Sequence, residues 1–321
     1  MLDEIKARMR LPLIGSPMFI VSGPELVIAQ CKAGIIGAFP ALNPRPQEEL
    51  AVWIEHIKEE LAKWDRDNPD RMSAPFAVNQ IVHKSNERLD HDLGVCVDHK
   101  VPIIISSLGA RPEVNSAVHE YGGLVFHDVI NNRFARKAID KGADGLIAVA
   151  AGAGGHAGST SPFALVQEIR EWFSGPLALS GSIANGRSLI AARALGADFG
   201  YAGSLFIATK EANAVQDYKD MLVGSSAEDV IYTDYFTGIY ANYLKPTIER
   251  AGIDIAQLRG AAPHQLNITE RREKGKAWKD IWGAGQGIGA IRGVTTVAGV
   301  VDRLYREYHQ ARAELCQPSF F

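Results

Sequence analysis

Eight short apolar segments, separated by stretches with helical spacing, constrain the fold of this chain more than any other feature. They lie at 11–18, 34–39, 75–81, 101–107, 123–129, 145–150, 176–182 and 199–204. Segments that are apolar on both faces are typical of parallel strands covered by helices. Eight strand–helix units in succession fit an α/β fold of the (β/α)8 TIM-barrel type better than an open doubly wound sheet.

The predicted helices and the end of the repeat indicate the domain organisation. Helical spacing is clearest at 23–34, 112–123, 132–144 and 186–198, and each of these segments ends in or near glycine. After the eighth apolar segment, residues 231–280 are polar, aromatic and charged without strand alternation. We predict a smaller, mostly helical unit over 212–280, and a final helix within 293–315 that packs back on the barrel. The barrel then comprises 1–211 and 281–321.

The composition excludes several classes of partner. A hydrophobic content of 46% is enough for a large core, and a formal net charge of −3 with scattered Lys and Arg argues against a nucleic-acid partner. No apolar run approaches the ~20 residues that span a bilayer, and charged residues are spread through the first ten positions. We therefore expect a cytoplasmic protein without a membrane partner. Three cysteines without CxxC spacing predict neither a disulfide framework nor a metal site.

Two turns at the ends of the last two predicted strands are suited to phosphate. TIM-barrel enzymes often bind phosphate at the loops after strands seven and eight. The seventh strand leads into Gly181 and Ser182, and the eighth, through Tyr201 and Ala202, into Gly203 and Ser204. Backbone N–H groups and two hydroxyls could hold a phosphate there, helped by the N-terminus of the helix that begins near residue 186. Singly, such glycines are more often ordinary βα turns; the pair favours phosphate.

A glycine-rich loop with one histidine follows the sixth predicted strand. The segment AGAGGHAG, residues 151–158, contains Gly154, Gly155 and His156. Glycine allows a flat ligand to approach the backbone, and imidazole can exchange a proton near neutral pH. A solvent-exposed linker would need the glycines but not the histidine. His127, at the end of the fifth predicted strand, is a second histidine that could face the same cavity, although alternation would point it and Asp128 to opposite sides.

The motifs together resemble a known family. GSPM in the first strand, PFAVNQ in the third, AGGHAG after the sixth, SGSIANGRSLIAARALGAD, GSLFIATKEA and WGAGQG are similar to the FMN-dependent nitronate monooxygenases, formerly called 2-nitropropane dioxygenases. The related FMN-dependent enoyl-acyl-carrier-protein reductases share much of this pattern. The resemblance implies a barrel that holds FMN, a smaller helical domain forming one wall, and a histidine near the flavin as the catalytic base.

The resemblance also implies roles for individual residues. His156 becomes the catalytic base. The implied FMN contacts are Pro17, Met18 and Asn79 at the flavin ring, Gly154 and Gly155 at its near edge, Gly181, Ser182, Gly203 and Ser204 at the phosphate with Tyr201 and Ala202 leading into the second turn, and Gln286 as a flavin or substrate contact. The chain departs from the family at Gly152, where a Glu is usual, and at Val149, where a Gln is usual. Both departures bear on the substrate.

The implied reaction oxidises a nitroalkane or its nitronate with dioxygen to a carbonyl compound and nitrite. His156 would remove or steer the acidic α-proton while FMN accepts the electron. The expected partners are therefore a small-molecule substrate and dioxygen, with a homodimer as an open option.

Two other flavin functions and one without flavin remain open from the sequence. An FMN-dependent NAD(P)H reductase, acting on an enoyl thioester or a quinone, would use the same fold and cofactor. A flavin-binding barrel without turnover would use them too. A sugar-phosphate lyase or isomerase would need a Lys or paired carboxylates at the strand ends, and no strand end carries a Lys.

Overall fold

A closed parallel barrel forms the centre of the molecule. The computed structural model describes residues 2–258 and 279–317. Eight parallel strands pair in the order β1-β9-β8-β6-β5-β4-β3-β2. The two ends of this sheet meet where the Gly15 N–H donates to the Ile36 carbonyl at 2.7 Å and the Ile36 N–H donates to the Leu13 carbonyl at 3.2 Å. The predicted TIM barrel is confirmed.

Every predicted strand segment overlaps an observed strand. The barrel strands are β1 (Leu13–Gly15), β2 (Gly37–Pro40), β3 (Phe76–Ile81), β4 (Ile103–Ser107), β5 (Leu124–Val129), β6 (Gly145–Val149), β8 (Leu177–Ser180) and β9 (Phe199–Ala202). Most of their residues are buried on both faces, which explains why the sequence shows continuous apolar runs instead of alternation.

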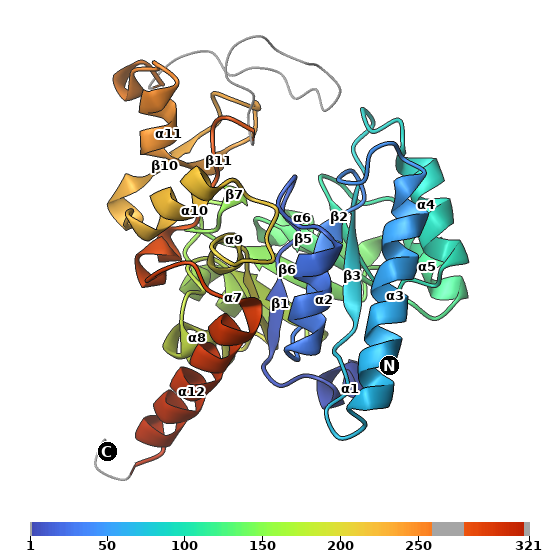
Figure 1. Cartoon of the computed structure of the whole chain (residues 1–321). Coiled ribbons are helices and arrows are strands. Elements are labelled where there is room, and N and C mark those ends of the chain that lie inside the picture. Colours follow the sequence, from blue (N-terminus) through green and yellow to red (C-terminus); the bar gives the residue numbers. More distant parts are fainter. Residues whose placement is uncertain (1, 259–278, 318–321) are drawn as a thin grey trace.

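Helices cover the outside of the barrel (Figure 1). They are α1 (Leu2–Ala7), α2 (Pro24–Lys32), α3 (Glu49–Asp67), α4 (Leu89–Asp98), α5 (Pro112–Glu120), α6 (Asn132–Asp140), α7 (Pro162–Arg170), α8 (Gly186–Leu195), the short α9 (Ser204–Ile207) and α12 (Val297–Leu315). The last of these is the predicted final helix, and it packs against α8 and α2. Pro at the first turn of α2, α5 and α7 begins each helix without losing a helical hydrogen bond.

The segment after α9 is less uniformly helical than predicted. It contains α10 (Gln216–Val223), η1 (Ala227–Asp229), β10 (Val230–Thr233), β11 (Ala241–Leu244), α11 (Lys245–Arg250) and η2 (Ile255–Leu258). The mostly helical prediction did not include the two strands here, β10 and β11, which form an antiparallel sheet with β7 (Gly155–His156). β11 is buried along its whole length, so its sequence lacks the alternation that marks a half-exposed strand. Residues 259–278 of the predicted unit lie outside the described residues.

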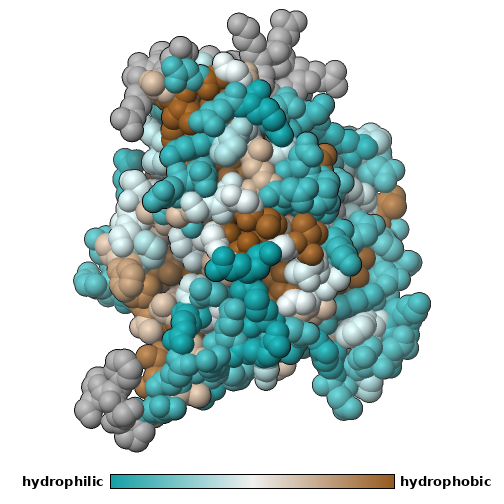
Figure 2. Space-filling view, turned by 60° about the vertical axis from the view of Figure 1, so that its left-hand side comes forward, coloured by the Kyte–Doolittle hydropathy of each residue, from teal (hydrophilic) through white to brown (hydrophobic). Residues whose placement is uncertain are grey.

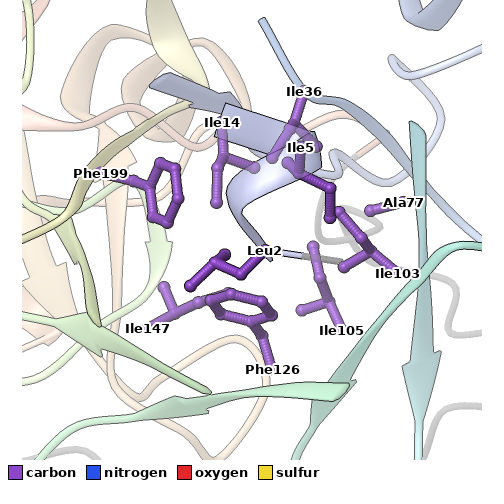
Figure 3. Close-up of a pocket in the computed structure, with 10 residues that line it drawn as sticks. All are labelled: Leu2, Ile5, Ile14, Ile36, Ala77, Ile103, Ile105, Phe126, Ile147 and Phe199. Carbon is purple, nitrogen blue, oxygen red and sulfur yellow. The ribbon is translucent and has the colours of Figure 1, made fainter. Parts of the chain in front are cut away.

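The interior of the barrel changes from apolar to polar along the strands. At the amino-terminal end, α1 closes the barrel and contributes Leu2 and Ile5 to a small cavity lined entirely by apolar side chains (Figure 3). This cavity belongs to the core and contains no group able to do chemistry. At the carboxyl end, the inward side chains include Asn79, Ser107, Asp128, Ser180 and Tyr201, which we call the mouth floor.

His127 lies outside the barrel interior, as strand alternation requires. It is 1% exposed, and its Nε2 lies 3.1 Å from Oδ1 of Asn115 on α5. Burial lowers the pKa of His127 to about 4, so the ring is neutral at physiological pH. The option that His127 lines the ligand cavity is therefore wrong; it packs between strand and helix.

No candidate membrane-spanning helix is present among the described residues. None of the helices in 2–258 and 279–317 combines the length and the apolar character needed to cross a bilayer. On the side shown in Figure 2 hydrophilic residues predominate, and hydrophobic ones form separate patches.

We expect Gly186→Ala to destabilise the protein where α8 meets α12. A Cβ at this position would overlap the backbone of Glu307 and Tyr308. Overpacking of this kind costs about 1–3 kcal/mol, which urea unfolding would measure. Gly94→Ala is the matched control, since Gly94 is exposed in α4 with nothing within 4 Å of an added Cβ; it should stabilise by about 0.5–1 kcal/mol. Equal unfolding midpoints for the two variants would contradict the packing argument.

His127 should make the stability of the protein depend on pH. Because its folded-state pKa is depressed to about 4, the unfolded chain binds a proton between about pH 6.5 and 4 that the folded chain does not. Stability is therefore lost as the pH falls through this window, by up to ~1.4 kcal/mol per pH unit. His127→Gln should reduce that loss in urea unfolding at pH 7, 6 and 5, whereas His56→Gln on the exposed face of α3 should not. Parallel curves for wild type and His127→Gln would refute the assignment.

Candidate active site

Four loops meet at the carboxyl end of the barrel. They follow β6, β8 and β9 and include the segment 283–287 near the chain's end. Together they enclose one hollow, which we call the cradle. The predicted site residues that line the cradle are Gly154, Gly181, Ser182, Tyr201, Ala202, Gly203 and Ser204, with Gly152, Ser180, Gly285 and Gly287 beside them.

Glycine allows these loops to touch backbone to backbone. A Cβ on Gly154 would lie 2.8 Å from the Gly285 nitrogen, and one on Gly285 would lie 2.8 Å from the Gly152 oxygen. The Gly285 N–H in turn donates to Oγ of Ser204 at 2.9 Å. The WGAGQG motif therefore ties the loop after β6 to the turn after β9.

The departure from the family at Gly152 has a steric cause in this chain. Gly152 has a φ of +83°, a conformation that favours glycine. A Cβ there would lie 2.6 Å from Oγ of Ser182 and 3.0 Å from Oε1 of Gln286. A glutamate at this position would therefore displace the side chains of Ser182 and Gln286.

The cradle offers hydrogen-bond donors without positive side chains. In the described part of the chain, the N–H groups of Ser182, Gly203 and Ser204 make no backbone hydrogen bond. Ser182 has a φ of +55°, a backbone conformation that non-glycine residues adopt rarely and that is associated with functional turns. The Ser204 hydroxyl accepts from Gly285, so its own hydrogen is available to a ligand. These groups fit a phosphate.

The N-terminus of α8 already has hydrogen-bond partners within the protein. Oδ1 of Asn185 accepts the Ser188 N–H at 2.8 Å, and the Gly186 N–H donates to Oε2 of Glu307 at 2.8 Å. The first donors of α8 are therefore satisfied within the protein. A phosphate in the cradle would depend on the two turns themselves.

Pro17 and Met18 lie in the loop after β1, next to the cradle. A Cβ on Gly203 would lie 3.2 Å from Sδ of Met18, so this glycine allows the sulfur to approach. The loop is held by Asn43, whose Nδ2 donates to the carbonyl of Met18 at 3.0 Å and whose Oδ1 accepts the Ile20 N–H at 2.9 Å. The sequence analysis did not identify Asn43, because nothing near it in sequence marks this contact.

His156 is placed by the small antiparallel sheet and not by the barrel. It pairs with Ala241 of β11, and its Nε2 lies 3.2 Å from Oγ1 of Thr237. That hydroxyl donates to the carbonyl of Ile239 at 3.0 Å, so it accepts from His156. The pattern assigns the proton to Nε2. Burial lowers the pKa of His156 to about 4, so the ring is neutral and able to accept a proton at neutral pH.

Gly155, Asn79 and His156 are predicted site residues that do not line the cradle, and Gly155 and His156 form β7. Asn79 lies on the mouth floor, where its Nδ2 donates to the carbonyl of Ile105 at 2.9 Å and to Oγ of Ser107 at 2.7 Å. His156 does not line the cradle in the described structure. A mononucleotide with its phosphate in the cradle would carry a ring system beyond it, so these positions suit contacts to the ring and not to the phosphate.

Comparison with known proteins identifies the family of this chain. The family model for nitronate monooxygenase matches residues 4–307. The nitronate monooxygenase of Paraburkholderia phytofirmans is 24% identical, with 99% of both chains covered. A relative from Mycobacterium tuberculosis is 32% identical, but that alignment spans 51% of this chain and 44% of the other.

Two solved structures share the whole fold. A nitroalkane oxidase from Streptomyces ansochromogenes superposes with a TM-score of 0.80 at 23% identity, covering 97% of this chain and 99% of the other. FabK from Thermotoga maritima superposes with a TM-score of 0.79 at 24% identity, covering 98% and 97%. At these identities the structures establish the fold. With the family model matching nearly the entire length, the chain belongs to the nitronate monooxygenase family and is a flavin-dependent oxidoreductase.

Proposed function

We propose that this protein binds FMN and oxidises nitronates or nitroalkanes with dioxygen to a carbonyl compound and nitrite. The observation that carries the proposal is the cradle, in which two serine-bearing turns after β8 and β9 meet in one hollow within a chain of this family. When bound, the flavin supplies the capacity to accept electrons from the substrate.

The phosphate of FMN would be held by the turns at Gly181–Ser182 and Gly203–Ser204. Their uncommitted N–H groups and the Ser204 hydroxyl supply donors of the kind that phosphates accept. Met18 would contact the ring from the loop after β1, and Gln286, whose Oε1 lies near Gly152 and Ser182, would contact flavin or substrate.

His156 is the proposed base. A neutral imidazole can take the acidic α-proton of a nitroalkane, and Thr237 holds the ring through Nε2. A depressed pKa makes the ring a weaker base but keeps it unprotonated down to about pH 5. A nitronate has already lost this proton, so its oxidation would not need the base.

Activity and its dependence on His156 test the proposal directly. The purified protein should show the absorption of bound flavin and release nitrite from propionate 3-nitronate and alkyl nitronates under air. His156→Ala should keep the flavin but slow turnover of a neutral nitroalkane about 10²–10⁴-fold, the usual contribution of a general base. If NAD(P)H bleaches the flavin rapidly without air and nitronates do not, the reductase is the correct function. A flavin that stays bound with no reaction in either assay would indicate a binding protein.

The phosphate position can be tested apart from activity. Ser182→Asp places a negative charge in the cradle and should weaken FMN binding about tenfold or more, which corresponds to ~1.4 kcal/mol or more of repulsion. Ser116→Asp, on an exposed position of α5, adds the same charge elsewhere and should bind FMN as the wild type does. Fluorescence titration of the flavin-free proteins measures both. Equal affinities would place the phosphate elsewhere.

A further inference from the structure

A buried carboxyl group on the mouth floor has no role in the function proposed so far. Asp128 lies near the end of β5 and points into the barrel, while its neighbour His127 points outward. The residue keeps some exposure toward the mouth, so a ligand there can reach it.

Asp128 is part of a chain of hydrogen bonds along the ends of three adjacent strands. Nδ2 of Asn79 on β3 donates to Oγ of Ser107 on β4, and that hydroxyl donates to Oδ2 of Asp128 at 2.5 Å. The Leu108 N–H also donates to the carboxyl. Leu108 has a φ of +60°, which is unfavourable for a leucine. The backbone is therefore strained at the residue whose N–H binds the Asp128 carboxyl.

The environment makes Asp128 easier to protonate than an ordinary aspartate. Enclosure by the barrel walls raises its pKa to about 6, against the opposing effect of the Ser107 and Leu108 donors. Among the described residues, no cation acts on this carboxyl. The other titratable group facing it is Tyr201 on β9, whose pKa is itself raised by burial and by Asp128. Tyr201 is neutral and does not compensate a negative charge.

The strand order places this chain opposite the cradle. In the closed sheet β1-β9-β8-β6-β5-β4-β3-β2, the strands that lead into the cradle, β8 and β9, face β3 and β4 across the barrel. A ring carried from a phosphate in the cradle across the mouth therefore reaches Asn79, Ser107 and Asp128. Both Nδ2 hydrogens of Asn79 are used within the protein, so its Oδ1 remains as an acceptor.

We propose that protonated Asp128 donates a hydrogen bond to a carbonyl oxygen of the flavin ring, while Oδ1 of Asn79 accepts the adjacent ring N–H. The isoalloxazine has an N–H beside two carbonyl groups at one edge, which calls for one acceptor and one donor close together, and Ser107 on β4 holds Asn79 and Asp128 near each other by bonding to both. A proton held at this edge also opposes the negative charge that the ring gains on reduction. This inference rests on the flavin binding proposed above and adds a specific ligand for the ring.

Proton uptake on FMN binding tests the proposal. Calorimetric titration of the flavin-free protein at pH 7.5, in two buffers of different ionisation enthalpy, counts the protons bound with the flavin. Wild type should take up close to one more proton than Asp128→Asn, in which the side-chain amide supplies the donor permanently. Subtracting the variant cancels protons exchanged by the FMN phosphate. Asp140→Asn, at an exposed position at the end of α6, should match wild type.

Affinity provides a second measurement on the same proteins. Above pH 6.5 the wild type should lose up to tenfold in FMN affinity per pH unit relative to Asp128→Asn, since only the protonated form binds. Asp128→Ala should bind more weakly than Asp128→Asn at every pH. Equal proton counts and parallel pH curves for wild type and Asp128→Asn would overturn this inference while leaving FMN binding intact. A wild type that does not bind flavin would overturn both this inference and the proposed function.

Discussion

The site depends on direct contact between backbones at the carboxyl end of the barrel. Gly152, Gly154 and Gly285 approach one another so closely that a Cβ on any of them would overlap a neighbouring group. This packing brings the Gly285 N–H to the Ser204 hydroxyl and sets the loop after β6 against the turn after β9. It also fixes where β7 leaves that loop, and therefore where His156 lies.

Strand alternation then decides the chemical role of each side chain at the mouth. His127 and Asp128 are adjacent in sequence, but they face opposite layers. His127 is neutral because it is buried between strand and helix, and it contributes to stability. Asp128 faces the ligand side, and its carboxyl joins Ser107 and Asn79 in one chain of hydrogen bonds. A shift of one residue in the register of β5 would exchange these two roles.

Much of the fold and the cradle could be predicted because their signals are local. Strands that are buried on both faces give continuous apolar runs in the sequence. The small residues after β8 and β9 indicate turns whose backbone groups line the cradle. The strand β11 was missed because it is buried along its whole length and pairs with the distant β7, and β10 was missed with it because β10 pairs only with β11. The N-terminus of α8 was assigned to a ligand because nothing in the local sequence shows that Glu307 already accepts from Gly186.

The sequence by itself determined the repeated strand–helix order, the positions of the glycine and serine turns, and the presence of one histidine in a glycine loop. Only the tertiary structure decided which groups meet around the ligand: Thr237 with His156, Gly285 with Ser204, and Asn79 and Ser107 with Asp128. The physical reason is that hydrogen-bond partners and pKa values depend on atoms within a few ångströms. The barrel, the small antiparallel sheet and the loops between them bring those atoms together from residues up to 81 positions apart in the chain.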